Sequence, residues 1–283
     1  MSHAGAPVGG LLVLVDPVAR RLDGESVRIA KDVLSAGAVA KICLPDSAEE
    51  FARALARRGH RQPVIVGDDR ALVRAVGLLH RERGLGDGAL ALVPVGPVGS
   101  LGLARSLGVP QTAVAAARAV LDGTARTYDL LVDDSDGVVL GALRIPPVRG
   151  PGRGSVRQVG PSVWSAYRSL VRTLVRPAAT AGVVGGAGGQ HHRLRVEADG
   201  VLLADVDRPV ADVSVSAGGD GDPMEVVVRT GGGFAATTVT ARAETVTVSG
   251  TDFRYRADGA MSGPVRRRTW TLRPGAWTLV LPR

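Results

Sequence analysis

The first half of the chain alternates short, continuous apolar runs with segments whose apolar residues recur at helical spacing. Runs such as Leu11–Val15 are typical of parallel strands that are buried on both faces of a sheet. The strand–helix alternation predicts an α/β domain, a doubly wound, mostly parallel sheet with helices on both faces. We expect strands at 11–15, 38–44, 64–66 and 89–93, and helices at 23–36, 47–59, 70–81 and 111–123.

After about Tyr128 the pattern changes to short runs of alternating or β-branched residues, separated by Asp, Gly and Pro. This pattern predicts an antiparallel, β-sandwich-like domain. We therefore expect two domains, residues 1–127 and residues 128–283. A Gly-rich stretch at 181–192 is typical of a linker, and it ends in a His-His pair. Because a metal site needs three or four converging donors, we expect a solvated loop at this pair.

One helical pattern, at 162–175, interrupts the β-rich half. Trp164 and the apolar residues after it recur at helical spacing, whereas Arg168, Arg172 and Arg176 lie four apart on another face. A basic amphipathic helix with an aromatic residue can lie in an anionic membrane interface, so these four residues are candidate membrane contacts. The alternative is that the apolar stripe packs on the protein and the arginines are solvated.

The composition of the chain indicates which partners and which cellular compartment to expect. The net charge of +8 favours anionic partners, and Cys43 is the only cysteine, so no disulfide can form within the chain. No apolar run reaches the length of a membrane span. We expect a cytoplasmic protein, at most peripheral at the inner face of the membrane. The basic residues lack interleaved aromatics, so a nucleic-acid partner is not expected.

Two loops carry the candidate chemistry. Gly67, Asp68, Asp69 and Arg70 stand between an expected strand and an expected helix, where backbone N–H groups can hold a phosphate. A second glycine-containing loop, with Pro94, Gly96, Gly99 and Ser100, follows the strand expected at 89–93. The carboxyl ends of parallel strands share one edge of a sheet, and ligands bind there.

In their order along the chain, these motifs resemble those of the diacylglycerol kinase family of lipid kinases. The family's Gly-Gly-Asp-Gly-Thr motif falls on residues 67–71, and its Pro-Leu-Gly-Thr-Gly-Asn-Asp motif falls on the stretch PVGPVGSLGLARSLGVP. The stretch AAARAVLDGTARTYDL is similar to the family's helix, glycine and strand, with Asp129 as its acid. Asp258 and Gly259 stand where the family carries Asp-Gly-Glu.

This resemblance implies a lipid kinase that transfers the γ-phosphoryl group of ATP, with Mg²⁺, to a lipid hydroxyl. It implies that Asp69 and Asp129 organise the nucleotide and the metal, and that Asp258 is the general base. The residues that it implies for nucleotide binding are Gly67, Asp68, Asp69, Arg70, Pro94, Gly96, Gly99, Ser100 and Asp129.

The departures from the family pattern favour an alternative. Asp68 and Arg70 replace glycines, Ala71 replaces a threonine, and the Thr-Gly-Asn-Asp core of the second motif is lost. A carboxylate that faces a phosphate at about 4–6 Å repels it by about one to a few kcal/mol, although Arg70 can offset this. The alternative is a catalytically inactive pseudokinase that binds lipid, nucleotide or a protein partner.

Two further alternatives concern single features. Asp258 can equally be a turn acid that precedes Gly259 in a hairpin. An enzyme similar to NAD kinases would share the glycine motif, but the C-terminal strands of this chain look more like those of the lipid kinases.

Overall fold

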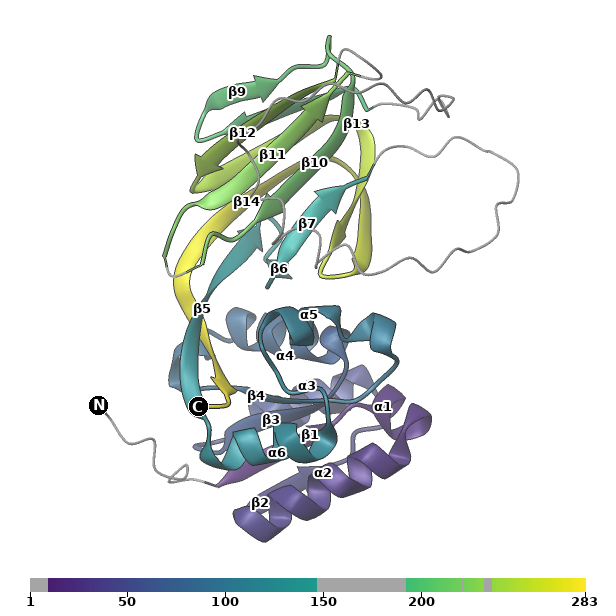
Figure 1. Cartoon of the computed structure of the whole chain (residues 1–283), viewed down its shortest axis with the longest axis vertical. Helices are drawn as coiled ribbons and strands as arrows, with labels where there is room; N and C mark the ends of the chain where they lie inside the picture. Colours follow the sequence, from purple (N-terminus) through teal and green to yellow (C-terminus); the bar gives the residue numbers. More distant parts are fainter. Residues whose placement is uncertain (1–9, 147–191, 220, 232–235) are drawn as a thin grey trace, which may run out of the picture.

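The computed structural model contains an α/β part and a β-rich part (Figure 1). The residues that it describes are 10–146, 192–219, 221–231 and 236–283. Several predictions concern residues outside these ranges: the basic helix at 162–175, the stretch 181–191, and the membrane contacts Trp164, Arg168, Arg172 and Arg176.

The α/β part has a four-stranded parallel sheet in the order β2-β1-β3-β4. The predicted strands and helices are present with shifts of a few residues, and the short helices α1 and α5 are additions to them. In chain order the elements are β1 (Leu11–Val15), α1 (Pro17–Leu22), α2 (Gly24–Gly37), β2 (Ala40–Cys43), α3 (Ala48–Ala56), β3 (Gln62–Gly67), α4 (Asp69–Arg81), the short turn η1 (Leu85–Asp87), β4 (Ala91–Pro94), the short turn η2 (Val98–Ser100), α5 (Gly102–Ser106) and α6 (Ala113–Asp122).

The continuous apolar strands are explained by helices on both faces of this sheet. In β1, Leu12 and Leu14 pack with residues of α3, α4 and α5. Their neighbours Leu11, Val13 and Val15 pack with residues of α1, α2 and α6 on the opposite face. Every residue of β1 is therefore buried, as doubly wound sheets require.

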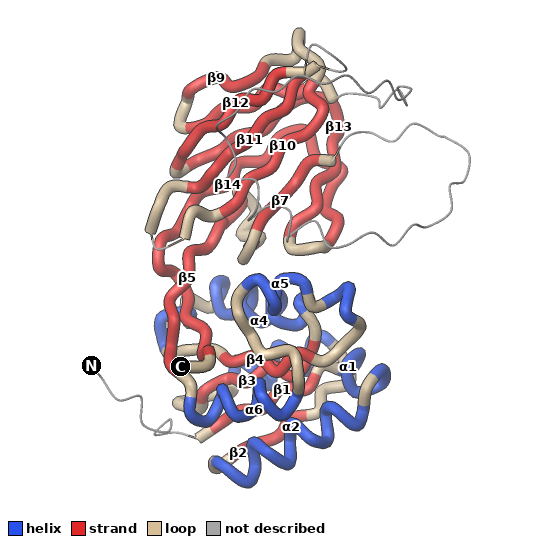
Figure 2. The backbone as a smooth tube through the Cα atoms, viewed as in Figure 1, coloured by secondary structure: helices blue, strands red, loops and turns tan. Residues whose placement is uncertain are grey.

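The β-rich part is an antiparallel sheet in the order β12-β11-β10-β7-β13-β14-β5-β6, and β8 and β9 extend from β13 (Figure 2). Its apolar residues face one another in a core of their own, which fits the predicted sandwich. The strands are β5 (Thr124–Asp133), β6 (Val138–Val139), β7 (Ala142–Ile145), β8 (Leu194–Ala198), β9 (Val201–Ala204), β10 (Val210–Ser216), β11 (Met224–Thr230), β12 (Thr237–Ala243), β13 (Thr245–Ala257) and β14 (Ala260–Leu281).

Two long strands, β5 and β14, connect the parts. They pair from Trp270 to Leu281 and run side by side from the β-rich part down to the α/β part (Figure 1). At the lower end, Leu90 N donates to Thr278 O and Val280 N donates to Leu90 O, both at 2.8 Å. The expected domain boundary at residue 127 falls inside β5, and the C-terminal end of β14 returns to the α/β part.

His192 departs from the expected solvated loop. Its side chain is buried, its backbone pairs with Val210, and its Nε2 lies 2.8 Å from the carbonyl oxygen of Pro146. The expectation of solvent exposure is therefore wrong for this residue. The contact joins the two described residues that flank segment 147–191 in the sequence.

Trp277 supplies a stability test of the connection between the parts. Its side chain is 1% exposed and belongs to the core that also holds residues of α4 and α5, and its Nε1 donates to Asp129 O at 3.1 Å. We expect Trp277→Ala to lower the free energy of unfolding by about 3–5 kcal/mol in urea titrations. Leu22→Ala, at a side chain that is 61% exposed, should change it by less than about 0.5 kcal/mol. Equal effects of the two substitutions would contradict this account of the core.

Candidate functional site

The candidate site lies at the carboxyl edge of the parallel sheet, where the loops after β1, β3 and β4 meet. Asp16 follows β1, and one of its carboxylate oxygens accepts from Val18 N at 2.8 Å and so caps α1. The other oxygen forms an ion pair with Arg74 of α4, also at 2.8 Å. The Arg74 guanidinium in turn lies 5.7 Å from the centre of the Phe51 ring. Asp16 therefore ties the first loop to α4.

Gly67, at the end of β3, lies where the fold leaves no room for a side chain. A Cβ at this position would lie 2.8 Å from Ala71 Cβ and 3.0 Å from Asp16 Cβ. The loop after β3 thus packs directly against the loop after β1, and a larger residue would push the two apart.

Asp68 caps the N-terminus of α4. Its side chain accepts from Ala71 N at 3.1 Å, as an N-cap residue does. The N-terminus of a helix attracts anions because its free N–H groups and the helix dipole point there. In this chain that position is taken by a carboxylate of the chain itself.

The side chain of Asp69 also accepts backbone N–H groups at the start of a helix, in this case α5. Its two carboxylate oxygens accept from Leu103 N and Ala104 N, each at 2.8 Å, and the side chain is buried. Burial raises the pKa of this carboxyl, and the neighbouring charge of Asp68 adds to the rise, while the backbone N–H donors oppose it. Asp69 therefore joins the turn after β3 to the loop after β4.

The loop after β4 packs against the same turn. Pro94 pairs with Gly67 in the sheet, and Gly96 has a left-handed φ of +153°. A Cβ on Gly96 would lie 3.0 Å from Ser100 Oγ and 3.3 Å from Asp68 Cβ. The Ser100 hydroxyl donates to the carbonyl of Pro97 at 2.9 Å. The two predicted loops are thus brought together.

Two predicted residues of these loops remain at the surface. Arg70 is exposed, and within the described ranges it forms no ion pair. Gly99 has no neighbouring atom within 4 Å of the position of a Cβ.

Asp258 comes from the β-rich part, at the turn between β13 and β14, where its φ is +46°. Its carboxylate accepts from Leu140 N at 2.7 Å and from Gly141 N at 2.8 Å, which ties the hairpin to the loop between β6 and β7. Burial, with a smaller contribution from the charge of Asp69, raises its pKa to about 6 against the pull of these donors. Asp258 and Asp69 thus interact between the two parts of the protein.

Asp129 is placed differently. In β5, its carboxylate accepts from Gly275 N at 2.8 Å and from Gly221 N at 3.3 Å. These partners belong to β14 and to the turn between β10 and β11, and none of them is a partner of Asp69. The hydrogen bonds of Asp129 therefore support the β-rich part of the protein.

The donor set does not fit a magnesium ion. Mg²⁺ is held by several oxygen ligands that converge, but Asp129 shares no hydrogen-bond partner with Asp69, and each carboxylate oxygen of Asp69, Asp129 and Asp258 already uses one lone pair to accept a backbone N–H group. Across the described ranges, no three His, Cys, Asp or Glu side chains converge into a set that could hold a metal ion. Among the N–H groups at this edge, Ala71 N is bonded to Asp68, and Leu103 N and Ala104 N are bonded to Asp69.

Sequence reasoning missed the contribution of Arg74 and Phe51. Arg74 falls within the predicted helix at 70–81, and only the fold brings it to Asp16. A signal was present, since the acid at Asp16 directly follows a buried strand and calls for a partner once it is buried.

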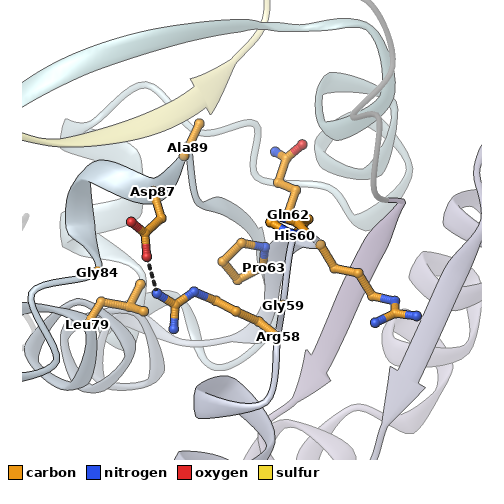
Figure 3. Close-up of a pocket in the computed structure, with 11 residues that line it drawn as sticks. Arg58, Gly59, His60, Gln62, Pro63, Leu79, Gly84, Asp87 and Ala89 are labelled. Atoms are coloured by element: carbon orange, nitrogen blue, oxygen red, sulfur yellow. Dashed lines mark hydrogen bonds and ion pairs between the residues drawn. The ribbon is translucent and has the colours of Figure 1, made fainter.

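A separate hollow of about 180 Å³ lies at the opposite edge of the sheet, where β3 begins. Figure 3 shows Arg58 reaching Asp87 beside Pro63, and the two charged groups are 2.7 Å apart. The hollow contains none of the predicted site residues. It is therefore distinct from the candidate site. In the described part of the chain, no helix has both the length and the apolar character needed to cross a bilayer.

The crowding at Gly67 gives a matched pair of substitutions. Gly67→Ala should destabilise the protein by about 1–3 kcal/mol, because the added methyl group meets Ala71 and Asp16. Gly99→Ala, in the same site but in open space, should change the free energy of unfolding by less than about 0.5 kcal/mol. Urea titrations of both variants test this, and a Gly67→Ala protein as stable as Gly99→Ala would refute the packing described.

The raised pKa of Asp258 predicts a pH dependence of stability. The folded protein holds this proton more tightly than the unfolded chain, whose pKa is near 3.8, so the stabilisation is complete below about pH 4. It is lost as the pH rises through about 6, and the shift corresponds to roughly 3 kcal/mol. Denaturant titrations at several pH values should show this fall in the free energy of unfolding.

The variant Asp258→Asn isolates the effect. It should be less stable than the wild type at pH 4, because its amide nitrogen meets a backbone N–H donor. Between pH 4 and pH 7 its stability should fall less steeply, with Asp69 contributing the remainder. An unchanged slope would show that Asp258 is not the titrating group.

Comparisons with known proteins support the fold. No family model matches the sequence, and no curated protein does. Three solved structures from Bacillus anthracis str. Sterne do match in fold. Two are described as "a putative diacylglycerol kinase", with TM-scores of 0.69 and 0.66 and sequence identities of 16% and 15%. They cover 96% of this chain, and this chain covers 97% and 96% of them.

The third structure, described as one of "diacylglycerol kinases", has a TM-score of 0.65 and 13% identity, with 96% of each chain covered. At such identities the comparison establishes the fold. The α/β sheet followed by a large antiparallel sheet is therefore the architecture of these diacylglycerol-kinase structures, as the motifs indicated.

Proposed function

We propose that this protein is a catalytically inactive pseudokinase with the lipid-kinase fold, and that it binds a lipid. One observation carries the proposal. The helix N-termini of α4 and α5, at the edge of the sheet where phosphates bind, are bonded to the carboxylates of Asp68 and Asp69.

The electrostatics of these two acids disfavour a nucleotide. A phosphate that approached α4 would meet the charge of Asp68, at a cost of about one to a few kcal/mol for charges about 4–6 Å apart. It would also have to displace the Asp68 carboxylate from Ala71 N. Each donor lost from a site that stabilises developing charge costs roughly 10²–10³ in rate, so phosphoryl transfer should be very slow.

The proposal that the ligand is a lipid rests on the resemblance to lipid kinases and on the fold shared with structures described as diacylglycerol kinases. The β-rich part, which the resemblance relates to the lipid-binding half of the family, keeps a complete apolar core. A lipid that carries a free hydroxyl, such as a diacylglycerol, is the ligand class that the resemblance favours.

A slow lipid kinase is the second candidate, and Asp258 is the observation that favours it. A buried carboxyl with a pKa of about 6 suits a general base near neutral pH. In that case Asp258 would take the proton of the lipid hydroxyl, and Gly67, Gly96 and Ser100 would line the nucleotide side. The hydrogen bonds from Leu140 and Gly141 would then orient the base.

The variant Asp68→Ser separates the two candidates. Serine is a good N-cap, so α4 keeps its capping hydrogen bond while the negative charge is removed. We expect calorimetry to show no saturable ATP binding by the wild type at millimolar concentration, with or without Mg²⁺. Asp68→Ser should bind ATP at least about tenfold more tightly, since removing the repulsion contributes more than about 1.4 kcal/mol.

Asp32→Ser is the matched control, because it removes an exposed acid from α2. It should bind ATP no better than the wild type. A labelled-phosphate transfer assay on diacylglycerol in mixed micelles completes the test. Magnesium-dependent ATP binding and labelled lipid with the wild type would replace the pseudokinase proposal with the kinase.

A further inference from the structure

The sheet of the β-rich part has an open side, which we call the outer face. Side chains that lie next to one another across its strands form a row on this side: Thr240, Val227, Ser214, Arg144, Arg256 and Met261. Their neighbours along each strand, including Val226, Val215, Leu143 and Tyr255, are buried in the core. The side chains along each strand therefore alternate between the core and the outer face, and the outer face carries those that point to solvent.

Arginines gather at one end of this face, where β7 meets the β13–β14 hairpin. Arg256 lies directly opposite Arg144 in the sheet, and Arg254 is two residues away on the same side of β13. Arg144 forms an ion pair with Asp212. Arg256 is exposed and forms no ion pair within the described ranges, and Arg254 donates only to a backbone carbonyl, that of Gly263.

Like charges directly opposite each other destabilise a sheet. Asp212 compensates Arg144, and an anionic partner on the outer face would compensate Arg256 in the same way. Met261, which lies opposite Arg256, is 48% exposed and adds an apolar side chain at the same place. Arginines around an exposed apolar side chain are the chemistry of a surface that enters the interface of a bilayer.

The chain that leaves this face has the same sign of charge. Pro146 directly follows β7, the strand that carries Arg144, and its carbonyl oxygen lies 2.8 Å from His192 Nε2; these two residues flank segment 147–191 in the sequence. The sequence of the segment contains six arginines and no acidic residue.

We propose that the outer face around Arg144, Arg254, Arg256 and Met261 docks on an anionic lipid bilayer. The inference rests on the proposed function, because a protein that takes a membrane lipid must meet the membrane. The same hairpin ends at Asp258, so docking here places the candidate site beside the bilayer. Among the described residues, this end of the face offers no exposed aromatic side chain for base stacking, which disfavours a nucleic acid.

Vesicle sedimentation tests the proposal. The wild type should bind phosphatidylcholine vesicles that contain phosphatidylglycerol, and bind pure phosphatidylcholine weakly. The double variant Arg254→Glu/Arg256→Glu should bind the anionic vesicles at least about 25-fold more weakly, since each arginine at an anionic surface contributes about fivefold. The variant should fold well, because the second substitution places a carboxylate opposite Arg144 in the sheet.

The control is Arg118→Glu/Arg126→Glu, which changes the net charge equally at two exposed arginines of α6 and β5. It should lose less than about threefold in affinity. Equal losses of affinity in both double variants would show that binding depends only on the net charge, and would overturn the proposal. Binding of the wild type to a DNA duplex that is tighter than its binding to the anionic vesicles would also overturn it.

The failure of this inference can be told from the failure of the proposed function. A wild type that binds diacylglycerol in neutral vesicles but ignores phosphatidylglycerol would keep the proposed function and overturn docking on the outer face.

Discussion

The candidate site depends on the buried carboxylate of Asp69. It accepts from Leu103 N and Ala104 N, so one side chain joins the turn after β3 to the start of α5. Asp16 and Gly67 pack against the other side of that turn, and the charge of Asp69 acts on Asp258 in the β-rich part. A charge buried to this degree must be hydrogen-bonded, and these amides meet that requirement. The same bonds take up N–H groups that an anionic ligand would use.

Strands β5 and β14 connect the two parts of the protein. Because these strands pass from one part to the other, residues such as Leu130, Trp277 and Leu279 enter the core that also holds residues of α4 and α5. The hairpin that ends in Asp258 belongs to the same β14, so the site and the outer face share one rigid support. A ligand that moved this hairpin would therefore act on both.

The sequence predicts the fold well where periodicity is strong. Continuous apolar runs such as Leu11–Val15 have few solutions other than buried parallel strands, and the second half alternates clearly. The site is harder to predict, because spacing does not show that Asp68 and Asp69 turn back to cap two helices. The buried acid Asp16 requires a partner, but nothing in the nearby sequence identifies Arg74, which lies in a different element. Asp129 follows the family order, but its hydrogen bonds depend on glycines far away in the chain.

The chain's own carboxylates occupy amides that would otherwise be free to receive phosphates. NMR of the labelled protein tests the consequence most directly, by following the amide signals of Ala71, Leu103 and Ala104 during a titration with ATP, with and without Mg²⁺. We expect these signals to stay in place up to millimolar ATP. Saturable, magnesium-dependent shifts at these three amides in the wild type would contradict the pseudokinase proposal.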